Sequence, residues 1–388
     1  MKNKRTMMLP GPVDVPHQAL LASAQKMIGH RTSDCEDLVA EVSEGLKYVF
    51  QTENDVLVLT CSGTGGLEAT LANTLSKGDK VLSLCTGAFG ERFATIAERY
   101  GIEVERMNFT WGEAVNADRV EEKLKEVGKG YFKAILMTHN ETSTGIVNHP
   151  KPLGKLAKEY GALLFIDAVS SLAGIELKTD KWKADVVVAS TQKALMSPPG
   201  LALVSVSPAA MKAREESDLP KFYWDFKRAK RFLNERPNQT PSTPAITTLY
   251  ALREVLKEIK EEGLGEVFDR HKIMAKAFRS AMKKIGLGLL VDNEDEASKT
   301  VTAVELPKEI KFSTLKERLL EEHNLYITGS KGHLKGKVFR VGHMGNTTKS
   351  DILTTISALE IVLKDEGLDL ELGSGIKAAQ EIFYKEER

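Results

Sequence analysis

Three groups of residues that could do chemistry each follow a short apolar run of strand character. Asp167 lies at the end of the run Ala162–Ala168, Lys193 follows the run Asp185–Ser190, and the glycine-rich loop Thr60–Glu68 follows a third run. Open α/β sheets bind their ligands beyond the carboxyl ends of their strands. We therefore expect an acid, an amine and a loop able to hold a phosphate to meet at one sheet edge.

Each of these groups also has a purely structural interpretation. The loop Cys61-Ser62-Gly63-Thr64-Gly65 matches neither GxGxxG nor GxxxxGK[ST], which disfavours a nucleotide site. It could equally be a capped strand-to-helix turn. Asp167 could likewise cap a helix, and a single lysine is most often a solvated surface charge.

The combination of the three groups is more informative than any one of them. Pyridoxal phosphate needs an anchor for its phosphate, an acid beside its pyridine nitrogen and an amine for its aldehyde. Lys193 lies between the apolar run Val186–Val188 and a Ser-Pro-Pro-Gly turn, where burial would lower its pKa and favour an imine. The residues therefore indicate pyridoxal 5'-phosphate as the cofactor.

The segment between residues 55 and 206 predicts the elements that position these groups. Short β-rich runs alternate there with helical patterns, and several runs are continuously apolar, as is typical of strands covered by helices on both faces. The expected strands are Val56–Cys61, Lys80–Cys85, Ile102–Met107, Lys133–Thr138, Ala162–Ala168, Asp185–Ser190 and Leu201–Val206. This pattern predicts an α/β fold with a mainly parallel seven-stranded sheet in an α/β/α sandwich.

A polar stretch from Leu219 to Pro244 marks a change of pattern. Two long helical patterns follow, and then short strands and helices of a small α+β domain. The expected elements are helices over 245–262, 264–286, 313–323 and 350–365, and strands over 300–305 and 338–341. We expect an N-terminal segment over the active site (1–20), a large cofactor-binding domain (21–250) and a small C-terminal domain (251–388).

Composition excludes several other classes of function. The 388 residues carry 54 Lys and Arg against 54 Asp and Glu, so the net charge is zero and neither nucleic acid nor a membrane surface is an expected partner. The three cysteines form no CxxC pair and no histidines have the HExxH spacing, so no metal site is expected. No apolar run approaches the ~18 residues of a membrane span, and we expect a cytoplasmic protein.

Motifs along nearly the whole chain resemble those of the class V pyridoxal-phosphate-dependent aminotransferases of fold type I. The resemblance is greatest to alanine–glyoxylate and serine–pyruvate (serine–glyoxylate) aminotransferases. The motifs are Leu9-Pro10-Gly11-Pro12, Ser62-Gly63-Thr64, Thr138-His139-Asn140-Glu141-Thr142-Ser143-Thr144-Gly145, Asp167-Ala168-Val169-Ser170-Ser171, Ser190-Thr191-Gln192-Lys193 and Phe339-Arg340-Val341-Gly342-His343-Met344-Gly345.

The resemblance implies a role for each matching residue. Lys193 corresponds to the lysine that forms an imine with the cofactor, and Asp167 to the acid that pairs with the pyridine nitrogen, so these two are the expected catalytic residues. Gly11 and Arg340 correspond to substrate-binding positions, Arg340 holding the α-carboxylate. The other expected cofactor contacts are Ser62, Gly63, Thr64, Phe89, Thr142, Val169, Gln192 and, from the neighbouring subunit of a homodimer, Thr243. Thr240 departs from the family, in which some members have Tyr.

The implied activity is amino transfer from a small amino acid, alanine or serine, to glyoxylate or pyruvate by a ping-pong mechanism. No second cation for an acidic side chain is evident in the sequence, so small substrates come first and aspartate is an alternative. A cysteine desulfurase would need a nucleophilic cysteine in the later half of the chain, whereas Cys35, Cys61 and Cys85 all come early. An inactive scaffold would have lost the cofactor residues, and they are present.

Overall fold

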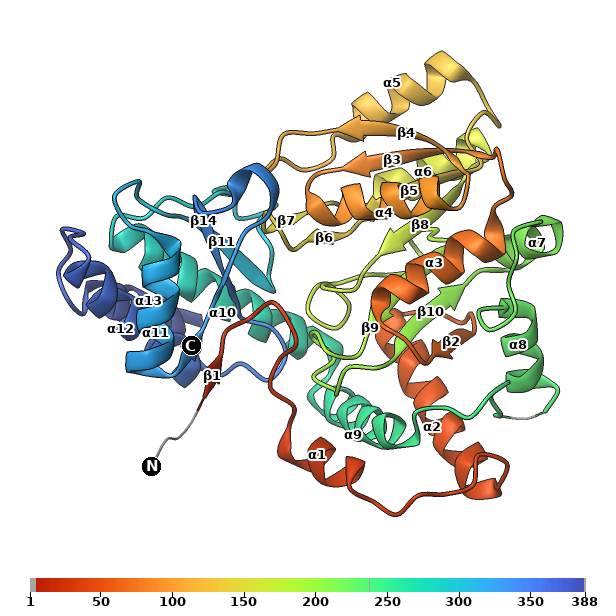
Figure 1. Ribbon diagram of the computed structural model, residues 1–388, viewed down its shortest axis with the longest axis horizontal. Coiled ribbons are helices and arrows are strands. Elements are labelled where there is room, and N and C mark those ends of the chain that lie inside the picture. Colours follow the sequence, from red (N-terminus) through yellow and green to blue (C-terminus); the bar gives the residue numbers. More distant parts are fainter. Residues whose placement is uncertain (1–4, 237, 387–388) are drawn as a thin grey trace.

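The computed structural model describes residues 5–236 and 238–386, so residues 1–4 and 387–388 of the expected end segments lie outside the described residues. A larger part holds the main sheet, and a smaller part built from the C-terminal third lies beside it (Figure 1). The N-terminal segment runs between the two parts, where strand β1 and helix α1 are labelled.

The expected parallel sheet is present, and all seven predicted strands belong to it within the described residues. Its order is β2-β10-β9-β8-β5-β3-β4, and only β10 runs antiparallel to its neighbours. The strands are β2 (Val56–Leu59), β3 (Lys80–Cys85), β4 (Glu103–Asn108), β5 (Ala134–Thr138), β8 (Leu163–Asp167), β9 (Val186–Ser190) and β10 (Ala202–Val206).

Helices cover both faces of this sheet. Along β8, Leu164 and Ile166 face a core shared with one layer of helices, whereas Phe165 faces a second core on the other side. The first layer contains α2 (Ser33–Phe50), α5 (Ala117–Val127), α6 (Pro150–Tyr160) and α9 (Ile246–Glu262), and the second contains α3 (Gly63–Thr74), α4 (Ala88–Arg99), α7 (Pro208–Glu216) and α8 (Phe226–Asn234). This alternation of facing residues confirms the α/β/α sandwich.

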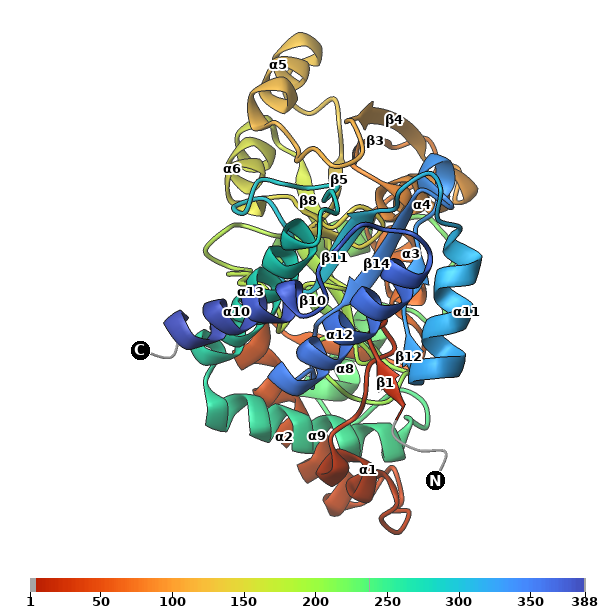
Figure 2. The same cartoon turned by 90° about the vertical axis from the view of Figure 1, so that its left-hand side faces the viewer.

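The small domain has a separate apolar core. An antiparallel sheet of order β11-β14-β13 packs there with four helices (Figure 2). Its elements are β11 (Val301–Glu305), β13 (Thr328–Gly329), β14 (Val338–Gly342), α10 (Leu264–Lys284), α11 (Phe312–His323), α12 (Lys349–Asp365) and α13 (Ser374–Glu386), with the short helix η1 (Gly332–Leu334) between β13 and β14. The sequence patterns predict all of the longer helices except α13.

The helix α9 has its buried residues in the large-domain core, whereas those of α10 lie in the small-domain core. Residue 250, the expected end of the large domain, falls within α9. Because Gly263 separates the two helices, we propose that the large domain extends to Gly263.

The N-terminal segment ties the two domains together. Its strand β1 (Thr6–Met7) pairs in parallel with β12 (Leu325–Tyr326), and Gly342 donates a hydrogen bond of 2.8 Å to the Met8 carbonyl. The following helix, α1 (His17–Ser23), packs on α9 of the large domain. The segment between β1 and α1 is therefore held across the junction of the domains, next to the strand that carries Arg340.

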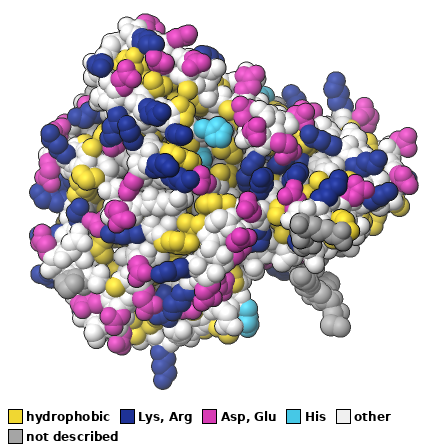
Figure 3. Space-filling model, turned by 180° about the vertical axis from the view of Figure 1, so that it is seen from behind, with side chains coloured by type: hydrophobic (Ala, Val, Ile, Leu, Met, Phe, Trp, Pro, Cys, Tyr) yellow, Lys and Arg dark blue, Asp and Glu magenta, His cyan; other side chains and the backbone are white. Residues whose placement is uncertain are grey.

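The surface carries no continuous field of one sign on the face drawn in Figure 3, where lysine and arginine side chains are interspersed with aspartate and glutamate. Within the described residues, no helix combines the length and apolarity that a membrane crossing requires.

Candidate active site

The carboxyl ends of three neighbouring parallel strands bring together the predicted acid and amine. Asp167 ends β8 and is paired in register with Thr138 at the end of β5, while Ser190 ends β9 and precedes Lys193 by three residues. The helix α3, which begins at the glycine-rich loop, packs on β9 and β10. The acid, the amine and the loop therefore meet at one edge, as the strand pattern predicts.

Asp167 is a buried carboxylate, only 3% exposed. Its Oδ1 accepts a hydrogen bond of 3.0 Å from the Val169 amide, and its Oδ2 lies 3.9 Å from the guanidinium of Arg92. Burial raises the pKa of Asp167 above its usual value, and the charges of Arg92 and Lys193 act against that shift. An acid so placed is suited to pair with a cationic N–H of a ligand.

Lys193 lies in a partly buried position covered by the N-terminal segment. Its Nζ donates a hydrogen bond to the Pro10 carbonyl. Gly11 adopts φ +94°, and a Cβ built on it would lie 2.7 Å from Lys193 Nζ, so only glycine leaves room for the amine there. Burial lowers the pKa of Lys193 to about 8; Asp167 opposes the shift, and Arg340, Arg92 and Lys331 add to it.

The predicted phosphate loop forms the start of α3. Ser62 is the N-cap residue of α3, is exposed and makes no side-chain capping bond. The first N–H groups of the helix therefore have no acceptor from the Ser62 side chain. A Cβ on Gly63 would lie 2.5 Å from the Val169 side chain, which places Val169 directly against this turn. Thr64, half-buried, is in the same turn.

Several buried polar atoms around this edge have no hydrogen-bond partner among the described residues. They are Thr138 Oγ1, Ser190 Oγ, Gln192 Oε1 and the Nε of Arg92. Buried polar groups are nearly always paired, and each unpaired one costs about 1–3 kcal/mol. Unpaired atoms gathered in one place indicate that a polar ligand belongs there.

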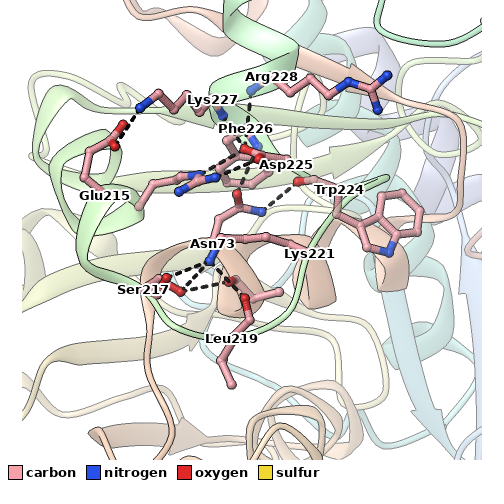
Figure 4. A network of polar contacts seen from close by, with 12 residues as sticks. Asn73, Glu215, Ser217, Leu219, Lys221, Trp224, Asp225, Phe226, Lys227 and Arg228 are labelled. Carbon is pink, nitrogen blue, oxygen red and sulfur yellow. Dashed lines mark hydrogen bonds and ion pairs between the residues drawn. The ribbon is translucent and has the colours of Figure 1, made fainter.

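Trp224 lies beside the phosphate loop and was not predicted from sequence. Its ring comes within 3.4 Å of where a Cβ on Gly65 would stand. Asn73 of α3 fixes the segment that carries it, since its side chain donates to the Trp224 carbonyl and accepts from the Phe226 amide (Figure 4). Asp225 in turn caps α8. The segment that precedes α8 is therefore locked onto the helix that begins at the phosphate loop.

Phe89 and Arg92 come from the first two turns of α4. The Arg92 guanidinium lies 4.6 Å from the centre of the Phe89 ring and also faces Asp167, a position that the sequence does not predict. The Phe89 and Gly90 amides donate to the carboxylate of Glu141, which is wholly buried. Glu141 thereby fixes the start of α4 and the position of the Phe89 backbone.

Arg340 connects the two domains. This guanidinium, 5% exposed, donates twice to the Gly329 carbonyl and once, over 2.9 Å, to the Thr142 carbonyl of the large domain. Since arginine has five N–H donors, two remain after these bonds to described residues, enough for a bidentate carboxylate. Burial lowers the pKa of Arg340 to about 10, which leaves it cationic at neutral pH.

Two predicted contacts are only partly placed at this site. The Thr142 carbonyl accepts from Arg340, but the Thr142 hydroxyl donates to Ser170 Oγ over 2.7 Å. Thr243 is exposed and lines a shallow hollow with Leu59 and Thr60, on the segment that the family resemblance assigns to a neighbouring subunit.

The family of this chain is shown by comparison with known proteins. The family model described as "Aminotransferase class-V" matches residues 16–352. The soluble hydrogenase 42 kDa subunit of Anabaena cylindrica is 39% identical over 99% of this chain and 100% of its own. The L-aspartate–glyoxylate aminotransferase of Paracoccus denitrificans is 35% identical over 99% of this chain and 97% of its own.

Structural comparison agrees with the sequence comparison and with the expected fold. The crystal structure of alanine–glyoxylate aminotransferase from Nostoc sp. matches with a TM-score of 0.89 at 32% identity, over 94% of this chain and 96% of that one. The resemblance that the motifs predict is thereby confirmed. The chain belongs to the class V aminotransferase family.

Proposed function

We propose that this chain is a pyridoxal-phosphate-dependent aminotransferase that passes the amino group of an amino acid to glyoxylate or pyruvate. The observation that carries the proposal is the meeting of the Lys193 amine, the Asp167 carboxylate and the Arg340 guanidinium at one sheet edge, close enough for Asp167 and Arg340 both to affect the charge state of Lys193. The names of the relatives support glyoxylate as the amino acceptor.

The residues at the edge fit the proposed cofactor. The N–H groups at the start of α3 would hold the phosphate, with Ser62, Gly63 and Thr64 around it and Gln192 beside it. The unpaired Ser190 Oγ and Gln192 Oε1 would gain a polar partner. Asp167 would pair with the pyridine N–H, and Val169 and Phe89 would contact the two faces of the ring.

Pyridoxal phosphate supplies an aldehyde for amine exchange and a ring that accepts the electrons of the α-carbon bond. Lys193 is the group that would carry the proton from that carbon, because a pKa near 8 leaves a substantial fraction of its amine neutral at physiological pH. At the ordinary value of 10.5, under about 1% of the amine would be neutral at pH 8.

The remaining residues orient the substrate and limit solvent. Arg340 offers two N–H groups to the substrate α-carboxylate, which fixes the substrate relative to Lys193. The Pro10–Gly11 segment covers Lys193 and keeps bulk water from its amine. The Thr142 backbone carbonyl accepts a hydrogen bond from Arg340. We propose that the Thr142 hydroxyl turns to the phenolic oxygen of the cofactor.

We further propose a homodimer in which Thr243 completes the phosphate site of the partner. Thr243 is exposed, and Phe222 and Tyr223 on a nearby segment are 75% and 50% exposed, which is unusual for aromatic side chains without a covering surface. All three cysteines are free thiols, and we propose the cytoplasm as the setting.

The alternatives gain less support. Burial raises the pKa of both Cys61 and Cys85 to about 12, so neither thiol is the reactive thiolate that a desulfurase needs. The name of the Anabaena relative points to a subunit of a soluble hydrogenase as a further alternative. A subunit without amino-transfer chemistry of its own would have no use for a lysine, an acid and an arginine kept together at the cost of burying their charges.

The test is the visible absorption of the purified protein with pyridoxal phosphate, first alone and then with alanine, serine or aspartate. The proposal predicts a band from the lysine-bound cofactor that disappears when an amino donor is added without an oxo acid. Glyoxylate or pyruvate should then restore it, in keeping with ping-pong exchange. If no band forms, or if none of the amino acids changes it, the proposal is wrong.

A further inference from the structure

Lys331 lies on a small-domain loop that reaches across to the large domain. Its Nζ is 4.8 Å from the centre of the Phe89 ring, on the first turn of α4. The loop is anchored through the two residues that precede Lys331. Ser330 donates to the Ser143 carbonyl over 2.6 Å, and Gly329 accepts from the Arg340 guanidinium. The ammonium group is thus held near the residues that frame the site.

The charges around Lys331 are unbalanced. Burial, Arg340 and Arg92 lower the pKa of Lys331, and Glu141 opposes them. Lys331 in turn affects the charge state of Lys193, so four cations share one region. Two carboxylates lie in the same region, and both have other partners. Asp167 faces Arg92, and Glu141 accepts hydrogen bonds from backbone amides of α4.

Lys331 itself forms no ion pair and no hydrogen bond with the residues that the structure describes. Its ammonium group contacts the face of Phe89, an interaction worth roughly 0.5–1 kcal/mol at an exposed site. A carboxylate would be a stronger partner for this ammonium than a ring face. The site therefore offers one cation, Arg340, for an α-carboxylate and a second, Lys331, for another anionic group of the same substrate.

We propose that Lys331 is a specificity-determining residue that binds the side-chain carboxylate of an acidic amino donor while Arg340 holds its α-carboxylate. This inference rests on the proposed function and names its donor class. The sequence alone favours small donors, since Lys331 is far from Arg92 and Phe89 along the chain and its loop shows no motif. With aspartate as donor and glyoxylate as acceptor, the amino group and a hydrogen are exchanged for an oxo oxygen, giving oxaloacetate and glycine.

The experiment compares the wild type with Lys331→Met, Lys331→Arg and the control Lys335→Met, an exposed lysine four residues along the same loop. The kcat and KM are measured for aspartate, glutamate, alanine and serine, each with glyoxylate as the acceptor. Lys331→Met should lower the kcat/KM for aspartate relative to alanine by about 10-fold or more, chiefly through KM. Lys331→Arg should restore most of the preference, and Lys335→Met should leave it unchanged.

Three results would overturn the proposal while leaving the aminotransferase function in place. In the first, the aspartate-to-alanine ratio is the same in Lys331→Met and the wild type, whatever happens to the overall rate. In the second, Lys331→Met weakens the binding of pyridoxal phosphate and slows all donors alike, which would assign Lys331 to the cofactor. If alanine or serine reacts and neither acidic donor does, this proposal fails and the aminotransferase function stands. If no donor reacts, the proposed function itself fails.

Discussion

The carboxylate of Glu141 caps the first turn of α4 and thereby fixes the backbone of Phe89. The Phe89 and Gly90 amides each lie 3.0 Å from Oε2, and the Ser143 amide lies 3.1 Å from Oε1. Burial raises the pKa of Glu141, while the hydrogen bonds from Ser143 and Gly90 favour the charged form. An anion at a helix N-terminus is also favoured by the helix dipole. One buried acid thus positions the aromatic ring on which both Arg92 and Lys331 rest.

Glu141→Gln should destabilise the protein and weaken cofactor binding. The amide would place N–H groups against backbone donors, so at least one buried donor loses its acceptor, at a cost of about 1–3 kcal/mol in the free energy of unfolding. Urea unfolding of the cofactor-free protein and titration with pyridoxal phosphate measure both effects. The control is Glu91→Gln in the same helix, whose half-exposed pair with Arg106 is worth under about 1 kcal/mol. Equal losses in the two variants would contradict the assignment.

The placement of Asp167 and Lys193 at one sheet edge could be predicted from sequence, because Asp167 ends one continuous apolar strand and Lys193 closely follows another, and strand ends are where α/β sheets place ligands. The seven strands were predictable for the same reason: buried strands have a distinctive composition. The motif around Glu141 can be recognised in the sequence, but the role of Glu141 as a helix cap cannot. The Phe89 amide that it accepts from lies 52 residues away in the sequence, so the cap is a tertiary contact.

Arg92 and Lys331 could not be found in this way. Arg92 lies in an amphipathic helix, where a charged residue normally faces solvent, and its position above Asp167 depends on how α4 packs on the sheet. Lys331 lies in an exposed loop without periodicity. The helix α9 was predicted as an element, but periodicity does not say which domain a helix packs on.

Lys193→Ala should abolish amino transfer without abolishing binding of the cofactor. The phosphate loop, Asp167 and Arg340 remain, whereas the amine that bonds the cofactor and moves the proton is lost. Borohydride reduction followed by mass spectrometry should find pyridoxyl-modified Lys193 in the wild type and no modified lysine in the variant. Lys337→Ala, an exposed change in the small domain, should behave as the wild type. Turnover near the parent rate in Lys193→Ala would remove Lys193 from this role.

Asp167→Asn should slow the removal of the α-proton by about 100-fold or more, the range seen when one preorganised electrostatic group is removed from an active site. Asparagine keeps the size of the side chain and its bond from the Val169 amide but loses the charge that stabilises a cationic pyridine ring. The kinetic isotope effect with α-deuterated donor in single-turnover experiments measures this step. A rate unchanged from the wild type would leave the proposed ring pairing without support.

The stability of the protein should fall steeply as the pH drops below about 6.5. Burial lowers the pKa of His139 to about 3 and that of His271 to about 4, and it lowers that of His343 well below its usual value. The unfolded chain therefore binds protons that the folded chain refuses, so the stability present above pH 6.5 is lost as the pH falls. One pH unit below 6.5, each histidine costs about 1.4 kcal/mol.

The contacts of His271 explain why its neutral form is kept. Its Nδ1 donates to the Val267 carbonyl over 2.7 Å, and its Nε2 accepts from the Gly345 amide over 2.9 Å, so a second proton would break the latter bond. The pKa values of Asp167 and Glu141 are raised by burial, so these two acids add stability as the pH falls and partly offset the loss from the histidines. Urea unfolding at several pH values should show a shallower decline in His271→Gln and an unchanged one in His17→Gln, an exposed control. Stability independent of pH between 5 and 7 would refute the prediction.

Gly11→Ala should impair the site much more than its effect on folding explains. The new Cβ would lie 2.7 Å from Lys193 Nζ, so the amine must move, and φ +94° adds backbone strain of about 1 kcal/mol. Gly78→Ala is the matched control, because Gly78 has φ +85° and a Cβ added there would have no atom within 4 Å. Both variants should lose similar stability, whereas only Gly11→Ala should bind pyridoxal phosphate slowly and transfer amino groups poorly. Equal activity in the two would show that Lys193 tolerates displacement.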